Sequence, residues 1–183
     1  MEPKKALLEK IEIPEGITIK IEGGIVMAKG LKNETKKTLL SPGIELKVEG
    51  SMVMISSKKK SKREKKLIGT FKAHIKNMFK GVSEGHKYTL KICAGHFPID
   101  VSFEKGIFAV KNFLGEKIPR TIKIKEGVSV KVEGDLVVVE GPSKDTASQV
   151  AADIEQLTRR PGYDTRIFQD GIYIINKDGK EIK

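Results

Sequence analysis

The feature that most constrains the fold of this 183-residue chain is an internal repeat. The segment IELKVEGSMVMI, residues 44–55, aligns without gaps on VSVKVEGDLVVV, residues 128–139. Upstream, GITIKIEGGIVMAKG, residues 16–30, aligns on PIDVSFEKGIFAVKN, residues 98–112. A repeat of this length encodes one supersecondary unit twice. We therefore expect two homologous domains in tandem.

Each copy shows the period-2 alternation of half-buried β-strands. Ile17, Ile19 and Ile21 alternate with polar residues, and Gly23 and Gly24 separate this run from the next. Alternating runs of this kind predict strands, and glycine supplies the positive φ that a tight hairpin requires. The same pattern recurs at the other aligned segments, so we expect each copy to open with two hairpins.

An amphipathic helix is expected after the hairpins of each copy, at residues 67–79 and 146–158. Ser143 is the expected N-cap of the second helix, and Pro161 with Gly162 is expected to end it. The sequence therefore predicts an α+β fold of two tandem homologous domains, each a mainly antiparallel β-sheet with one packed helix.

The domain boundaries follow from the repeat. Residues 1–81 are expected to form the first domain and residues 98–175 the second, with a C-terminal extension at 176–183. The stretch 88–93 could form a strand that returns to complete the first domain.

The composition favours a polyanionic partner. Lys and Arg number 35 against 24 Asp and Glu, for a net charge of +11 and a pI near 9.6, and such a surface attracts nucleic acid. An anionic membrane is the weaker choice, because no run approaches the length of a spanning helix and the N-terminus lacks an apolar segment. The single Cys93 suits a reducing compartment, so we expect a cytoplasmic protein.

Candidates for catalysis are few. Cys93 and His96 have the spacing of half a metal site, but no second Cys pair is present. Phosphate-binding and hydrolase motifs are missing from the sequence, so we expect no enzymatic activity, cofactor, metal or small-molecule substrate. One alternative is an RNA-processing or RNA-modifying enzyme that uses Cys93, His96 and Asp100, and another is a basic protein-interaction module.

Two segments could bind a polyanion. The first is a basic run expected to be a flexible loop before the first helix: Lys58, Lys59, Lys60, Lys62, Arg63, Lys65 and Lys66. The second follows the last helix, where Arg159, Arg160 and Arg166 alternate with Tyr163 and Phe168. Arginine beside aromatic rings suits structured RNA, because it offers phosphate donors next to surfaces on which unpaired bases stack.

Charge and contact chemistry favour different copies. Residues 1–81 hold 19 Lys or Arg against 9 Asp or Glu, a difference of +10, while residues 82–183 hold 16 against 15, a difference of +1. The second copy also places Lys144 beside the expected helix N-terminus at Ser143, which is a ready phosphate site. We give local arrangement more weight than net charge, because phosphate positioning depends on where donors converge.

Several of these segments match a known family. The KVEG hairpins, KNFLGEKIPRTIKI from Lys111, SQVAADIEQLTRRPGYD from Ser148 and the closing FQDGIYI resemble the sixth protein of the large ribosomal subunit in its archaeal form. The resemblance implies a structural protein that binds large-subunit rRNA near the sarcin-ricin loop and the translation-factor site, mainly through its second domain. Neighbouring large-subunit ribosomal proteins are implied as further partners. RNA contact is implied at or near Ser143, Lys144, Thr146, Gln149, Arg159, Arg160, Tyr163, Arg166, Phe168 and Gln169.

Overall fold

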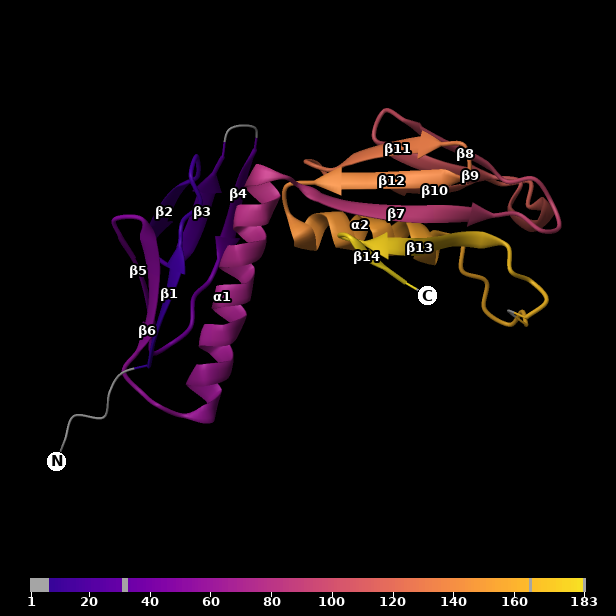
Figure 1. Cartoon of the computed structure of the whole chain (residues 1–183). Helices are drawn as coiled ribbons and strands as arrows, with labels where there is room; N and C mark the ends of the chain where they lie inside the picture. Colours follow the sequence, from indigo (N-terminus) through magenta and orange to yellow (C-terminus); the bar gives the residue numbers. More distant parts are fainter. Residues whose placement is uncertain (1–6, 31–32, 165, 183) are drawn as a thin grey trace. The chain divides into compact units, whose positions relative to one another are not determined.

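The computed structural model describes residues 7–30, 33–164 and 166–182, and divides the chain into two compact units, Met1–Gly85 and His86–Lys183 (Figure 1). Residues 1–6 of the expected first domain and residue 183 of the expected extension lie outside the described part. Each unit has its own buried core.

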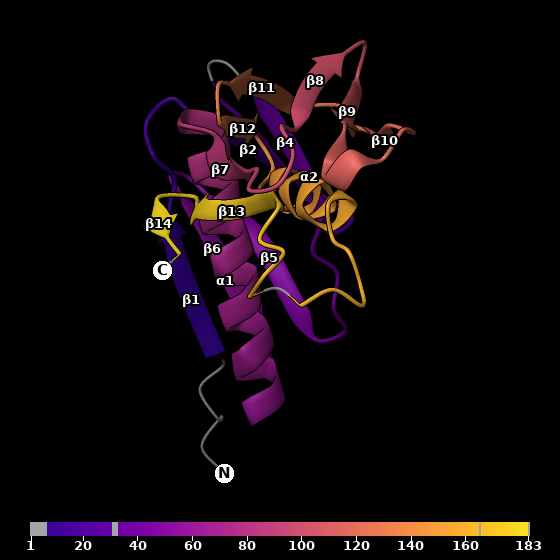
Figure 2. The same cartoon turned by 90° about the vertical axis from the view of Figure 1, so that its right-hand side faces the viewer.

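The first unit consists of two three-stranded antiparallel sheets and one helix. One sheet has the order β1–β6–β5, with β1 at Leu7–Glu12, β6 at Met52–Ser57 and β5 at Ile44–Glu49. The other has the order β2–β3–β4, with β2 at Thr18–Glu22, β3 at Ile25–Lys29 and β4 at Glu34–Thr38. The helix α1, Lys62–Ser83, packs against strands of both sheets (Figure 2).

The core of the first unit is aliphatic with two phenylalanines. The helix buries Ile68, Phe71 and Ile75 against sheet residues such as Val26 and Val53. At the end of β3 a side chain on Gly30 would place its Cβ 2.6 Å from the carbonyl oxygen of Val82, so glycine is required for this close packing.

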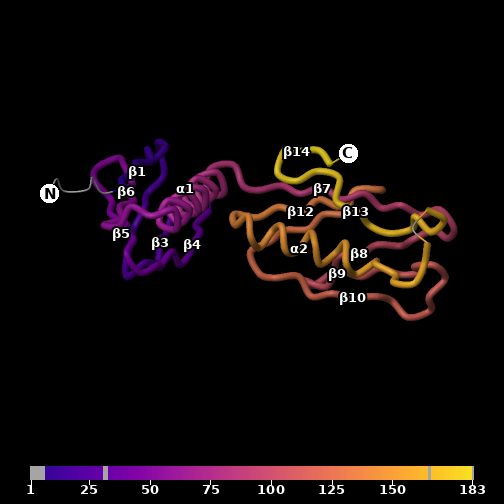
Figure 3. The backbone as a smooth tube through the Cα atoms, turned by 90° about the horizontal axis from the view of Figure 1, so that it is seen from below, coloured from indigo at the N-terminus to yellow at the C-terminus, as the bar shows by residue number. Residues whose placement is uncertain are grey.

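The second unit repeats this plan with a larger sheet. Its five-stranded sheet has the order β11–β12–β7–β13–β14: Ser129–Glu133, Leu136–Gly141, His86–Cys93, Gly171–Lys177 and Lys180–Glu181. Its three-stranded sheet has the order β10–β9–β8: Arg120–Lys123, Ile107–Lys111 and Asp100–Glu104. The short helix η1, Phe113–Gly115, precedes β10. The helix α2, Lys144–Leu157, contacts both sheets (Figure 3).

The expected fold class is confirmed, and so are the four hairpins. They are β2–β3 and β5–β6 in the first unit, and β8–β9 and β11–β12 in the second. Each unit contains two sheets where we expected a single one, because β4 and β10 pair with the first hairpin of each copy and form a separate sheet.

The expected return of strand 88–93 to the first domain is wrong. Strand β7 lies at the centre of the second unit's sheet and pairs with β12 on one side and β13 on the other. Its Tyr88 and Leu90 are buried in the core of that unit. Residues expected as the C-terminal extension instead form the end of β13 and the edge strand β14.

The basic run is not a flexible loop throughout. Helix α1 begins at Lys62, where Ser61 accepts a hydrogen bond from the N–H of Arg63 at 3.2 Å and donates to Glu64. Ser61 and Glu64 thus have the spacing of a helix capping box. Because lysine and arginine also have high helix propensity, the basic residues from Lys62 onward are helical, and only Lys58 to Lys60 remain in the loop.

Candidate nucleic-acid interface

The first group of predicted ligands surrounds the N-terminal end of α2. Ser143 caps the helix by accepting from the N–H of Thr146 at 3.5 Å, and the Thr146 hydroxyl donates to the carbonyl oxygen of Ser143 at 3.1 Å. The Lys144 ammonium lies 3.9 Å from Asp178. Gln149 is exposed one turn further on and donates to Asp153 at 2.7 Å. This end thus offers a positive helix terminus beside one lysine.

The second group lies at the opposite end of the same helix. A 14-residue helix is about 21 Å long at 1.5 Å per residue, so the two groups form separate surfaces. The 158–170 segment, which follows α2, is tied to β13 at its start. The buried Thr158 hydroxyl accepts from the N–H of Ile172 at 2.9 Å, and the Glu155 carboxylate accepts from the N–H of Ile174 at 3.0 Å.

A pocket of about 550 Å³ lies between the C-terminal end of α2 and this segment. It brings together four of the predicted ligands, Arg159, Arg160, Tyr163 and Phe168. The other lining residues are Leu114, Glu155, Gln156, Thr158, Pro161, Gly162, Asp170 and Tyr173. The predicted ligands Arg166 and Gln169 are exposed outside it, and Gln169 donates to the carbonyl oxygen of Arg166 at 3.4 Å.

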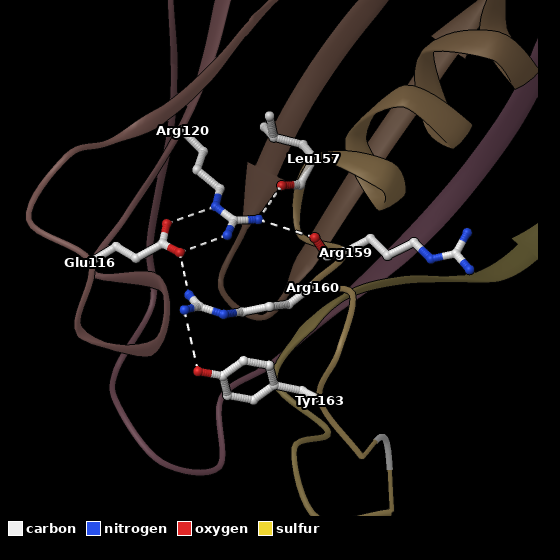
Figure 4. A network of polar contacts seen from close by, with 6 residues as sticks. All are labelled: Glu116, Arg120, Leu157, Arg159, Arg160 and Tyr163. Atoms are coloured by element: carbon white, nitrogen blue, oxygen red, sulfur yellow. Dashed lines mark hydrogen bonds and ion pairs between the residues drawn. The ribbon is translucent and has the colours of Figure 1, made fainter.

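A carboxylate holds two arginines at one side of the pocket (Figure 4). Glu116 accepts two hydrogen bonds from Arg120, both 2.7 Å long, and a further one from Arg160. Arg120 also donates to the carbonyl oxygen of Leu157 at 2.8 Å and to that of Arg159 at 3.3 Å. The last carbonyls of a helix carry a partial negative charge, so Arg120 stabilises the end of α2 and the start of the 158–170 segment.

Both arginines also contact aromatic rings. The guanidinium carbon of Arg120 lies 4.4 Å from the ring centre of Phe113, and that of Arg160 lies 4.6 Å from the ring centre of Tyr163. Arg160 donates to the Tyr163 hydroxyl at 3.3 Å as well. The pKa of Glu116 lies below its ordinary value of 4.5, chiefly because of the Arg120 hydrogen bonds and then the charges of both arginines, which together outweigh the opposing effect of burial.

The three predicted arginines therefore differ in what they can offer to RNA. Arg160 is held by Glu116 and Tyr163, whereas the Arg159 side chain extends away from this network in Figure 4. Arg159 is exposed and makes one long hydrogen bond, 3.5 Å, to Gln156. Arg166 is exposed as well but forms a two-point pair with Asp164, at 2.7 and 3.1 Å. Arg159 is thus the most available phosphate donor of the three.

Three rings form a row beside the pocket. Phe168 stacks on His96 with ring centres 5.0 Å apart and meets Tyr163 edge to face at 4.8 Å. The His96 ring pairs with Asp170 at 2.6 Å, and Asp170 also accepts from the N–H groups of Gly95 and His96 at 2.8 and 3.0 Å.

The carboxylate of Asp170 therefore joins the 94–97 turn to the end of the 158–170 segment. Burial opposes its charged form, but the hydrogen bonds from His96 and Gly95 outweigh this effect, and the pKa of Asp170 lies below its ordinary value. The ionised carboxylate is thus the form that fits this site.

The residues considered for catalysis do not converge. His96 pairs with Asp170 and stacks on Phe168, while Asp100 is exposed on β8. Across residues 7–30, 33–164 and 166–182, no three His, Cys, Asp or Glu side chains are grouped to hold a metal ion. Among the same residues, no helix is long and apolar enough to cross a membrane.

The predicted ligands of the first unit lie before and at the start of α1. Lys58, Lys59, Lys60, Lys62 and Arg63 are all exposed, and Lys58 lies 3.3 Å from Glu45. These residues belong to the first unit and are not among the lining residues of the pocket. Their role as RNA ligands stays a prediction.

Comparison with known proteins gives one consistent result. The family model described as Ribosomal protein L6 matches residues 13–85 and 97–171, one match for each copy of the repeat. Large ribosomal subunit protein uL6 of Methanococcus vannielii is 48% identical over 97% of this chain and 98% of its own length. The uL6 proteins of Methanobrevibacter smithii and Methanothrix thermoacetophila are 40% and 42% identical over 94% and 93% of this chain, and over 97% of their own lengths.

The duplicated fold and these matches define a class, the structural and non-enzymatic proteins of the cytoplasmic ribosome. The chain belongs to the ribosomal protein L6 family, and the resemblance expected from its sequence motifs is confirmed. The enzymatic alternative is thereby set aside.

Proposed function

We propose that this chain binds large-subunit rRNA through its second unit, with the surface around the pocket at the C-terminal end of α2 as the main contact. The observation that carries the proposal is the convergence of Arg159, Arg160, Tyr163 and Phe168 on one pocket of about 550 Å³. Cations beside aromatic rings bind phosphates and unpaired bases of folded RNA. Membership of a ribosomal protein family supports RNA as the ligand.

The N-terminal end of α2 serves as a second, smaller contact in this proposal. Its backbone N–H groups and Lys144 favour a phosphate, with Ser143, Thr146 and Gln149 beside it. The contacts at the two ends, about 21 Å apart along the helix, would engage separate stretches of one RNA.

We further propose that the RNA lies near the sarcin-ricin loop and the translation-factor site, with neighbouring large-subunit proteins as additional partners. This location is what the family resemblance of the sequence motifs implies, and membership of a ribosomal protein family supports a place in the ribosome. Hydroxyl-radical footprinting of large-subunit rRNA with the full chain tests it. Protection at the sarcin-ricin loop is expected, and protection confined to a distant region would contradict it.

Arg159→Ala tests the contact surface itself. Removing one exposed phosphate donor should lower affinity for an rRNA fragment about 3- to 10-fold and reduce the salt dependence by roughly one phosphate contact. Lys131→Ala is the control, because Lys131 is an exposed cation on β11 that is not among the lining residues of the pocket. Equal effects of the two substitutions would mean that only total charge matters, and would overturn the assignment of this surface.

A further inference from the structure

The helix of the first unit, α1, carries a second basic surface. This surface extends well beyond the basic run, which ends at Lys66 in the first turns of the helix. Six lysines recur at intervals of one to six residues along α1: Lys62, Lys65, Lys66, Lys72, Lys76 and Lys80. At 100° per residue they fall within an arc of about 120°, and they extend along about 27 Å of the helix. We call this set the lysine stripe. It lies away from the face that buries Ile68, Phe71 and Ile75.

Three of these lysines also act on one carboxylate of the neighbouring strand β1. Lys72 donates to Glu9 of β1 at 2.6 Å. The pKa of Glu9 lies below its ordinary value, mainly because of that hydrogen bond and the charge of Lys72, with smaller contributions from Lys65 and Lys76. Lysines from three different turns of α1 therefore act on the same carboxylate. An open pocket whose lining includes Lys10, Lys72 and Lys76, together with Glu12, borders the stripe.

A glycine stands in the middle of the stripe. Gly69 is exposed, and a Cβ built on it would meet no heavy atom within 4 Å. Glycine inside a helix is less stable than alanine, and no packing within the unit requires it here. Ala73, one turn further on, is also small and exposed. At these two positions no long side chain covers the helix, so another molecule can approach the helix backbone closely.

The chemistry of the stripe favours nucleic acid over protein. The centres of protein–protein interfaces are depleted of lysine and enriched in aromatic residues, and the stripe positions of α1 hold no aromatic side chain. Without aromatic rings to stack on, unpaired bases would add little to the binding affinity. The phosphates of a helical RNA backbone, by contrast, can be bound by regularly placed cations alone.

We propose that the lysine stripe binds the phosphate backbone of an RNA duplex, with Gly69 and Ala73 at the point of closest approach. This inference rests on the proposed function only in taking RNA as the class of ligand. It does not depend on the pocket of the second unit. It gives the first unit an RNA contact of its own, made by charge and shape rather than by stacking.

The test compares two triple variants of the full chain with the same loss of charge. In K62Q/K66Q/K76Q three stripe lysines are neutralised. In the control K20Q/K29Q/K36Q the three lysines lie on β2, β3 and β4, and all three are exposed. Affinity for a 20-base-pair RNA duplex is measured over a series of salt concentrations. The stripe variant should bind about tenfold more weakly, with a salt slope reduced by roughly two, and the control should lose less than threefold. Equal losses would overturn the proposal.

Gly69→Gln tests the close approach without a change of charge. The added side chain faces open space, so the melting temperature should not fall, while affinity for the duplex should fall several-fold. Unchanged affinity would show that Gly69 is not part of the contact.

If the stripe variant binds the duplex normally but leaves large subunits at lower salt, the partner is a protein and the proposal is wrong. Binding of rRNA by Arg159→Ala is measured separately, so the proposals for the two surfaces can be overturned independently.

Discussion

The two helices occupy equivalent positions in two copies of one repeat, yet they use their surfaces in opposite ways. Helix α1 has 22 residues and carries its basic groups along its side as lysines. Helix α2 has 14 residues and is followed by three arginines, of which Arg160 is held by Glu116, Arg166 pairs with Asp164 and Arg159 is exposed. The first unit, with 19 Lys or Arg against 10 Asp or Glu, has a difference of +9, and the second, with 16 against 14, has +2.

The difference shows which parts of a duplicated fold are free to diverge. In both units the inward face of the helix packs on two antiparallel sheets, and the hairpins agree. The changes lie where the helix starts in the first unit and where it ends in the second. Lysines on the side of a helix attract any phosphate backbone, whereas arginines fixed against rings present a defined geometry. We therefore expect selectivity from the second unit and general affinity from the first.

The strongest test of the fixed geometry is Arg120→Ala. The substitution removes two charged hydrogen bonds to Glu116 and the donors to the carbonyls of Leu157 and Arg159. It should lower the free energy of unfolding by about 2–3 kcal/mol, measured by urea denaturation. Lys123→Ala, an exposed position on the same strand, should change it by less than about 0.5 kcal/mol. A similar small effect for both would mean that the network does not stabilise the second unit.

Asp170→Asn should have the next largest effect. The amide oxygen can still accept from the N–H groups of Gly95 and His96, but these bonds lose their charge assistance, and the amide nitrogen cannot accept from the His96 ring as the second carboxylate oxygen does. We therefore expect a loss of about 2 kcal/mol. Hydrogen exchange provides the direct readout, because the amides of Gly95 and His96 should exchange faster. If their protection were unchanged, the turn at 94–97 would be held by other contacts.

A smaller effect, with a defined pH dependence, is expected for Glu116→Gln. The pKa of Glu116 is lowered in the folded state, so its contribution is fully present above the ordinary value of 4.5 and is lost as the pH falls through the lowered folded-state value. At pH 7 the variant should be less stable by about 1 kcal/mol. This difference should shrink once the pH falls below 4.5. Urea denaturation over a pH series measures it, and a difference independent of pH would exclude the ionised pair as the cause.

The smallest expected effect on stability belongs to Arg160→Lys, which conserves charge. Lysine cannot bridge Glu116 and the Tyr163 hydroxyl as the arginine does, so Tyr163 should lose its fixed position. Stability should fall by about 0.5 kcal/mol, but affinity for an rRNA fragment should fall several-fold. Wild-type affinity would show that charge alone suffices in the second unit too, which would remove the contrast between the units.

Local sequence signals were sufficient for most of the elements. Alternation and turn glycines identified the hairpins, and helical periodicity identified the buried faces of α1 and α2. The start of α1 was missed although Ser61 and Glu64 form a capping pattern, because the lysines between and after them suggested a loop. Strand β7 was placed in the wrong unit because pairing with β12 and β13 is a long-range property that a short alternating run does not encode.

The predicted ligands around the pocket were identified by residue type, but the residues that position them were not. Glu116 is 44 residues from Arg160, and His96 is 74 residues from Asp170. Pairs so distant in sequence leave no local pattern, and a single glutamate near a turn looks like any exposed residue. Glu116 and Arg120 do fall inside the segment that resembles the family, and that segment was the only indication of their importance.

The central claim is that the second unit supplies the selective contact and the first unit a general one. Co-sedimentation with large subunits through a salt gradient compares them directly, using Arg159→Ala with Phe168→Ala for the pocket surface and K62Q/K66Q/K76Q for the lysine stripe. We predict that the pocket variant leaves the subunit at the lower salt concentration, because charge contacts of the stripe alone do not survive moderate salt. Retention of the pocket variant at wild-type salt, with early loss of the stripe variant, would contradict the account.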